Sequence, residues 1–100
     1  MTTQITENSN QIIAKFSGRL DTAAAAQIME EVNPLMEATN KEIILDCAAL
    51  DYISSSGLRI FLKIRKEASA NNSKVIVRNI NNEISQVFMM TGFVSIFEIQ

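Results

Sequence analysis

The stretch from Glu42 to Arg78 alternates between strand-like and helix-like patterns. Glu42–Cys47 and Lys74–Arg78 are short, apolar and rich in β-branched residues, which is typical of buried strands. Between them, a set of residues recurs at helical spacing and predicts a helix that ends at Asn71–Asn72: Leu58, Phe61, Leu62, Arg65 and Ala68. Strands that alternate with helices indicate a sheet with parallel pairs covered by helices.

The N-terminal part predicts a hairpin followed by a helix. Thr3–Glu7 and Gln11–Phe16 have strand character, and the residues between them, Asn8-Ser9-Asn10, favour a turn. After a turn at Gly18, a helix is expected to start near Thr22, capped by Asp21 or Thr22. Its apolar face consists of residues at steps of three and four: Ala25, Ile28, Met29, Val32, Leu35 and Met36. Pro34 is expected to kink this helix or to restart it as a second short segment.

The C-terminal part predicts one more helix and one more strand. Asn81 or Asn82 caps a helix that ends at Gly92, a residue suited to a left-handed stop, and Ser95–Ile99 forms the last strand. One hundred residues with 47% hydrophobic content suffice for one core. We therefore expect a single α/β domain over residues 1–100, with a mixed sheet of about four to five strands and helices packed on it.

The composition argues against several classes of function. Nine basic and eleven acidic residues give a net charge of −2, which provides no basic field for a direct nucleic-acid partner. The chain has no histidine, on which catalytic triads and most zinc sites depend. No catalytic residue, metal site or cofactor is expected, and we interpret the chain as a protein that is not an enzyme.

The chain is expected to lie in the cytoplasm without membrane insertion. No apolar stretch approaches the roughly 20 residues that cross a bilayer, and the residues after Met1 lack the basic and apolar regions of a signal peptide. The one cysteine, Cys47, sits in an apolar run and is interpreted as an unreactive core thiol.

A run of three serines and a glycine, Ser54–Gly57, lies where a strand is expected to pass into a helix. The first N–H groups of a helix lack partners within it, so Ser54 or Ser55 can cap them while Gly57 lets the backbone turn tightly. Alternatively, one hydroxyl accepts a phosphate, which free N–H groups and the helix dipole stabilise at this position. The spacing of the residues leaves both interpretations open.

Four segments, taken in order, resemble the STAS domains, a family named for sulfate transporters and anti-sigma factor antagonists. The resemblance spans essentially the whole chain and is specific because the four segments occur together. They are Phe16-Ser17-Gly18-Arg19-Leu20-Asp21, Ile44-Leu45-Asp46, Tyr52-Ile53-Ser54-Ser55-Ser56-Gly57-Leu58 and Phe88-Met89-Met90-Thr91-Gly92-Phe93. In the third segment, Ser54 stands where the family usually has aspartate.

The resemblance implies a STAS fold and a phosphorylation switch. It places the acceptor on Ser55, with Ser56 and Ser54 as the alternatives, and the partner-binding surface on Asp21, Ser54, Ser56, Gly57, Arg59 and Lys63. The partners it implies are an anti-sigma factor that is also a serine-protein kinase, and a serine phosphatase. Taken without the resemblance, Asp21 is a helix cap, and Arg59, Lys63 and Lys66 form a solvated face.

The function this implies is that of an anti-sigma factor antagonist. Unphosphorylated, it binds its partner and releases a sigma factor or another client, and phosphorylation breaks the complex. STAS domains also serve in transport systems, so the alternative is an accessory subunit of a membrane lipid or anion transport complex. A nucleotide-binding or nucleotide-hydrolysing protein ranks last, because no glycine-rich phosphate loop with a lysine is present.

Overall fold

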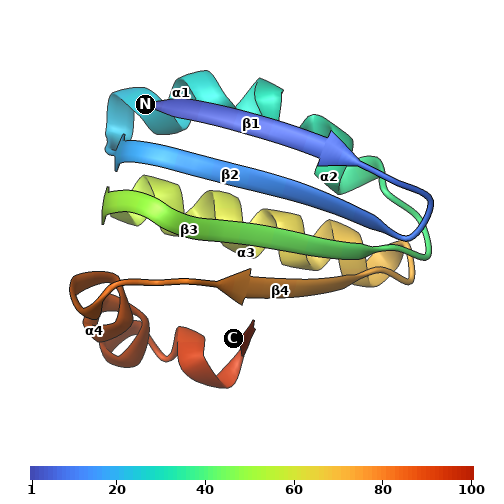
Figure 1. The fold of residues 1–100 in the computed structure, drawn as a ribbon. Coiled ribbons are helices and arrows are strands. Elements are labelled where there is room, and N and C mark those ends of the chain that lie inside the picture. Colours follow the sequence, from blue (N-terminus) through green and yellow to red (C-terminus); the bar gives the residue numbers. More distant parts are fainter.

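Five strands lie side by side in chain order in one sheet (Figure 1). The computed structural model describes all residues from 1 to 100. The strands are β1 (Thr2–Glu7), β2 (Gln11–Leu20), β3 (Glu42–Ile53), β4 (Lys74–Arg78) and β5 (Glu98–Ile99). β1 pairs with β2 in antiparallel fashion, and β2 to β5 run parallel. The predicted α/β domain with a mixed sheet is confirmed.

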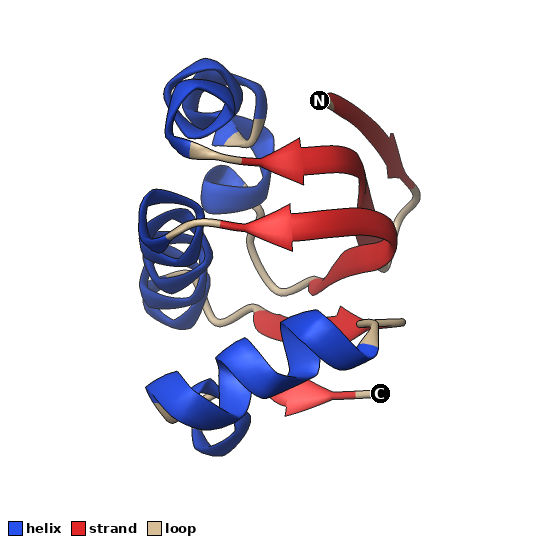
Figure 2. Cartoon of the chain, turned by 90° about the vertical axis from the view of Figure 1, so that its left-hand side faces the viewer, coloured by secondary structure: helices blue, strands red, loops and turns tan.

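The helices connect the parallel strands. They are α1 (Thr22–Glu31), α2 (Asn33–Glu37), α3 (Ser55–Ala70) and α4 (Asn82–Thr91), followed by the short 3-10 helix η1 (Phe93–Ser95). Because the sheet grows in one direction and crossover connections are right-handed, α1, α2 and α3 lie on the same face of the sheet (Figure 2). The helix break at Pro34 is observed, since Pro34 lies in the first turn of α2.

The core lies between this helical layer and the sheet. Fully buried side chains come from the strands and from the inner faces of α1 to α4, and include Phe16, Phe61 and Phe88. Five phenylalanines form a connected cluster, in which the ring centroids of Phe16 and Phe61 lie 5.5 Å apart and those of Phe88 and Phe93 lie 5.4 Å apart. The cluster ties α3, α4 and η1 to the sheet.

Several details differ from the sequence-based expectation. β2 continues past Phe16 through Gly18, where φ is 99° and the pairing register shifts, to Leu20, so the expected turn at Gly18 is a bulge within the strand. β3 extends beyond Cys47 to Ile53.

On α3, Ile60 and Ile64 are buried, whereas Leu62 is 38% exposed and Arg65 is exposed, because the helix turns a neighbouring face toward the sheet. The last strand, β5, spans only Glu98–Ile99 and is therefore shorter than the expected Ser95–Ile99. Gly92 stops α4 at φ 80°, and the chain then turns through η1 so that both Phe93 and Phe97 reach the core. No helix in the structure is both long enough and apolar enough to cross a bilayer.

Candidate functional site

Strands β2 and β3 end side by side, and this edge brings the predicted site residues together. Leu20 and Ile53 are paired across the two strands, and the Ser54 N–H donates to the Leu20 carbonyl at 2.8 Å. Asp21 and Ser54, the next residues along each strand, are therefore neighbours. This serine edge, formed by Asp21 and Ser54–Gly57, lies at the left of Figure 1 and faces the viewer in Figure 2.

Ser54 is the residue that caps α3. Its backbone is extended, with φ −87° and ψ 171°, and its Oγ accepts a hydrogen bond from the Gly57 N–H at 3.2 Å. The residue is only 9% exposed. An aspartate in this position would cap the helix in the same way, so the serine preserves the local structure while removing a charge.

Ser55 and Ser56 have different surroundings from Ser54. Ser55 is the first residue of α3, and its side chain is exposed and makes no hydrogen bond within the chain. Ser56 is half-buried and faces α1. Of the three serines, Ser55 is the most exposed, and the side chains of Ser55 and Ser56 both make no hydrogen bond within the chain, whereas that of Ser54 does.

Gly57 is required for close packing and not for an unusual backbone conformation. It lies within α3, and its φ is not in the left-handed region. A Cβ atom there would lie 2.7 Å from Leu20 Cγ and 2.9 Å from Ile53 Cγ1, closer than such atoms approach in proteins. The glycine thus lets α3 start directly against the ends of β2 and β3. The expected tight turn at this residue is not observed, because Gly57 has a helical backbone.

Asp21 is the N-cap of α1. Its Oδ1 accepts from the Ala24 N–H at 2.9 Å, and the residue is half-buried. Its other carboxylate oxygen has no partner within the chain. The geometry therefore accounts for a capping role and leaves one oxygen free at the serine edge.

Arg59 and Lys63 lie on the exposed side of α3, and neither makes an ion pair. Arg59 also lines a shallow groove of about 280 Å³ between α1 and α3, together with Thr22, Ala25, Ala26, Met29, Ser56 and Ile60. The sequence placed Met29 in the core, but it is only half-buried. The α1 side of this groove was missed because helical spacing alone does not separate the rim of a buried face from its centre.

Arg19 and Tyr52 form a second feature of the same edge that the sequence analysis did not single out. They are paired across β2 and β3, and the Arg19 guanidinium lies 4.3 Å from the centre of the Tyr52 ring. Tyr52 is 39% exposed. The register of the two strands is the signal that would have identified them, since both directly precede a core residue, Leu20 or Ile53.

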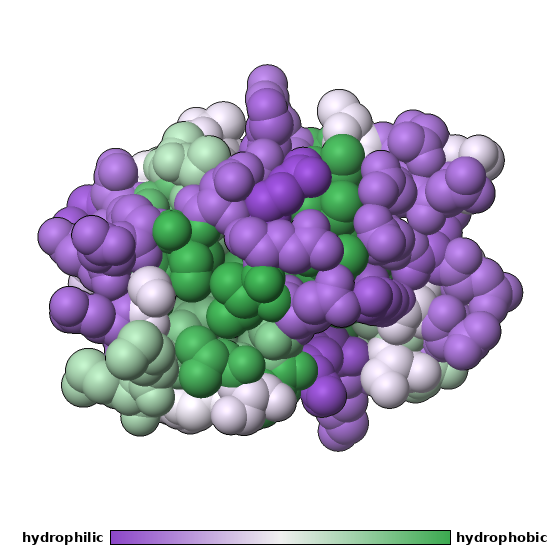
Figure 3. Space-filling view, turned by 60° about the horizontal axis from the view of Figure 1, so that its bottom comes forward, coloured by the Kyte–Doolittle hydropathy of each residue, from purple (hydrophilic) through white to green (hydrophobic).

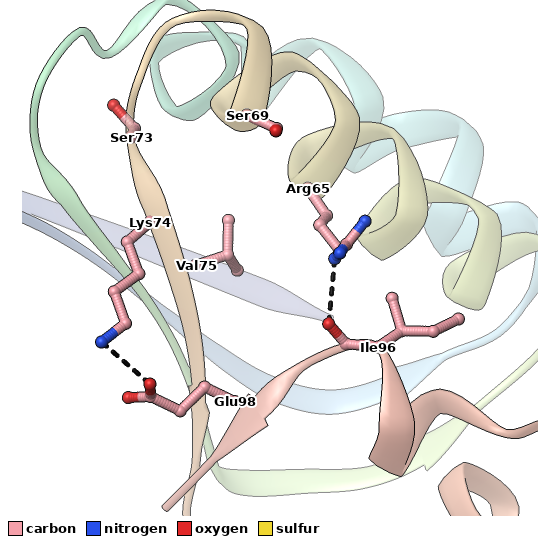
Figure 4. Close-up of a pocket in the computed structure, with 7 residues that line it drawn as sticks. All are labelled: Arg65, Ser69, Ser73, Lys74, Val75, Ile96 and Glu98. Atoms are coloured by element: carbon pink, nitrogen blue, oxygen red, sulfur yellow. Dashed lines mark hydrogen bonds and ion pairs between the residues drawn. The ribbon is translucent and has the colours of Figure 1, made fainter.

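A polar hollow between α3 and the C-terminal segment serves a structural role. Its charged groups are already engaged, because Arg65 Nε donates to the Ile96 carbonyl at 3.0 Å and Lys74 Nζ lies 2.8 Å from Glu98 (Figure 4). The hydrogen bond between the Lys74 and Glu98 side chains raises the pKa of Lys74 and lowers the pKa of Glu98. These contacts fasten the last residues to α3 and β4.

An apolar patch covers part of the face formed by α4 and η1 (Figure 3). Its most exposed members are two adjacent methionines, Met89 and Met90, of which Met90 is 85% exposed. Val94 and Ile96 are also exposed. None of these four residues belongs to the serine edge.

The sequence matches a family model described as the STAS domain over residues 2–100. The chain is 31% identical over 88 residues to BtrV of Bordetella bronchiseptica, a candidate anti-sigma factor antagonist, and the match covers 88% of this chain and 76% of that protein. Among solved structures, a candidate anti-sigma factor antagonist from Thermotoga maritima has a TM-score of 0.87 at 20% identity, covering 97% of this chain and 84% of that one.

Two further structural neighbours bear on function. The Bacillus cell fate determinant SpoIIAA in its phosphorylated form has a TM-score of 0.75 at 21% identity, covering 99% of this chain and 91% of that one. A sulfate transporter family protein from Wolinella succinogenes has a TM-score of 0.77 at 13% identity, covering 94% and 79%. At these identities the likeness concerns the fold.

Proposed function

The chain belongs to the STAS domain family, and we propose that it is an anti-sigma factor antagonist that works as a phosphorylation-controlled partner switch. Unmodified, it binds an anti-sigma factor that is also a serine-protein kinase, and a sigma factor or another client is released. The kinase then transfers a phosphoryl group to Ser55 Oγ, and the complex dissociates. A serine phosphatase restores the binding form.

The observation that carries this proposal is the difference between Ser54 and Ser55. Ser54 Oγ is buried and accepts the Gly57 N–H, whereas the Ser55 side chain is exposed and unengaged. A kinase therefore reaches Ser55 without disturbing the cap of α3. A phosphate there is compatible with the fold, because the first N–H groups of a helix favour a negative charge.

Charge explains why modification breaks the complex. A phosphoserine adds about −1.5 to −2 charges where the partner meets a neutral hydroxyl, and Asp21 already places a carboxylate at the same edge. Repulsion and desolvation at an interface cost several kcal/mol of binding. The binding surface in this proposal consists of Asp21, Ser54, Ser56, Gly57, Arg59 and Lys63. The chain itself acts in the cytoplasm as a binding protein, without catalysis or a cofactor.

Variants of Ser55 test this proposal against the partner obtained by co-purification. Ser55→Ala removes the acceptor without adding bulk or charge, so it should bind like wild type and resist phosphorylation. Ser55→Asp should bind more weakly, though less so than the phosphorylated chain, because a carboxylate carries one charge. Calorimetry gives the affinities, and mass spectrometry locates the phosphate.

Ser56→Ala is the matched control, and it should still be phosphorylated on Ser55. Full phosphorylation of Ser55→Ala on Ser54 or Ser56 would show that the acceptor is another residue. If a purified partner kinase modifies none of the three serines, the switch proposal fails.

The second candidate function is an accessory subunit of a membrane lipid or anion transport complex. The fold shared with a sulfate transporter family protein favours it. In that case the chain would co-purify with a permease or an ATPase in place of a serine kinase, and Ser55→Asp would leave that association unchanged.

A further inference from the structure

Arg59 is an unpaired cation placed one helical turn after the proposed acceptor. It lies four residues after Ser55 on α3, so the two side chains project from the same face, about 6 Å apart along the helix axis. Both residues are exposed, and Arg59 takes part in no ion pair and no side-chain hydrogen bond within the chain. Its five N–H donors are thus available to an outside group.

Arg59 is also the only charged residue of the groove between α1 and α3. The other lining residues are apolar, such as Ala25, Met29 and Ile60, or carry a hydroxyl, as Thr22 and Ser56 do. A groove with an apolar floor and one guanidinium fits a partner segment that presents an apolar side chain next to a carboxylate. Arginine suits that contact because its planar fork binds a carboxylate through two hydrogen bonds.

A phosphate on Ser55 competes for the same guanidinium. Side chains four residues apart on a helix are neighbours, and phosphate oxygens are stronger acceptors for arginine than a carboxylate of single charge. Lys63 lies one helical turn further from Ser55 than Arg59 does, so it should bind the phosphate more weakly than Arg59. The Asp21 carboxylate is engaged in capping α1 through Oδ1 and forms no pair with Arg59.

We propose that Arg59 changes partners during the switch. In the unmodified chain it binds a carboxylate of the partner at the mouth of the α1–α3 groove, and after phosphorylation it pairs with the phosphate on Ser55. This inference rests on the proposed function. Phosphorylation then weakens the complex in two ways, because it adds negative charge and withdraws the cation that the partner uses.

Phosphorus NMR of the full chain tests the internal pair without any partner or kinase. Phosphoserine is introduced at position 55 during translation, and its second pKa is titrated in wild type, Arg59→Met, Arg59→Lys and Lys66→Met. A pair with Arg59 favours the dianion, so the pKa should be lower in wild type than in Arg59→Met by about 0.3 unit. Arg59→Lys should keep part of this shift.

Lys66→Met is the charge-matched control, because Lys66 is an exposed cation on the same helix but three turns from Ser55. It should titrate like wild type. Equal second pKa values in wild type and Arg59→Met would overturn the proposal, as would an equal shift in Lys66→Met. Since the phosphate is built in, this result does not depend on whether a kinase acts on Ser55.

Partner affinity tests the other half of the exchange. With the partner from the Ser55 experiments, Arg59→Met should weaken binding of the unmodified chain at least fivefold and change binding of the phosphoserine form less than twofold. Equal losses in the two forms would show that phosphate does not withdraw Arg59. A phosphoserine form that binds as tightly as the unmodified chain would instead contradict the proposed function, while the NMR result for the internal pair would stand.

Discussion

Three adjacent serines occupy three different environments at the start of α3. Ser54 is nearly buried and caps the helix, Ser55 faces solvent, and Ser56 is half-buried beside α1. The differences follow from position, since a cap must turn its hydroxyl back toward the helix N–H groups while the next residue points outward. Substitutions at neighbouring positions should therefore have distinct effects.

Ser54→Ala should destabilise the domain while Ser54→Asp should not. Alanine removes the acceptor of the Gly57 N–H, and losing an N-cap costs about 0.5–2 kcal/mol of unfolding free energy. Aspartate restores an acceptor and should remain within about 0.5 kcal/mol of wild type. Urea unfolding measures both, with Ser55→Ala as the control. Equal stability of Ser54→Ala and wild type would contradict the assignment of the cap.

Gly57→Ala should destabilise the domain by overpacking. The added Cβ would meet Leu20 Cγ at 2.7 Å and Ile53 Cγ1 at 2.9 Å, and inserting a methyl group into a packed core typically costs about 1–3 kcal/mol. Ser56→Ala, on the same helix turn, should change stability by less than about 0.5 kcal/mol. Thermal melting distinguishes the two. A melting temperature of Gly57→Ala equal to that of wild type would show that the helix start can shift.

The C-terminal segment shows how a short element is held in place. β5 has only two residues in the sheet, paired with Ile76 and Val77. Phe93 and Phe97 are buried in the aromatic cluster, with ring centroids 5.5 Å apart, whereas Lys74 and Glu98 form an exposed ion pair. Burial of large aromatic surface outweighs an exposed ion pair, so the phenylalanines should dominate its stability.

Phe97→Ala should cost about 3–5 kcal/mol, as expected for a buried aromatic side chain. Glu98→Gln should lower the melting temperature far less, and its effect should shrink in high salt. Because the ion pair lowers the pKa of Glu98, the contribution of this pair to folding stability is present above the ordinary carboxyl pKa and is lost as pH falls through the lowered value. Melting curves at several pH values test both the pH dependence and the relative size of the two effects. A larger loss of stability in Glu98→Gln than in Phe97→Ala would contradict the dominance of the phenylalanines.

For the whole molecule, Cys47 reports on global unfolding. It lies on the central strand β3, fully buried, and burial together with the nearby Asp46 charge raises the pKa of its thiol from 9.0 to about 12. Because the pKa of the thiol is higher in the folded state than in the unfolded state, its protonation contributes stability that is fully present below pH 9.0 and is lost as pH rises toward 12.

Alkylation of Cys47 at pH 8.5 should therefore require unfolding. The rate should be at least about 10³-fold below that of an unstructured cysteine peptide, and it should rise with urea in proportion to the unfolded fraction. Labelling followed by mass spectrometry gives the rate, and the destabilised Gly57→Ala variant should react faster. Rapid labelling without urea would show local opening of β3.

The sequence alone determined the element order and the serine run, and it placed each of two helix caps at one of two neighbouring residues, Asp21 or Thr22 and Asn81 or Asn82, because these features depend on local periodicity and on backbone groups within one turn. It did not determine which face of α3 is buried, the length of the last strand, or which serine is engaged. Packing against the sheet decides these features, since several rotations of an amphipathic helix satisfy the same spacing. The Arg19–Tyr52 pair and the α1–α3 groove likewise exist only because the strand register and the tertiary fold bring distant residues together.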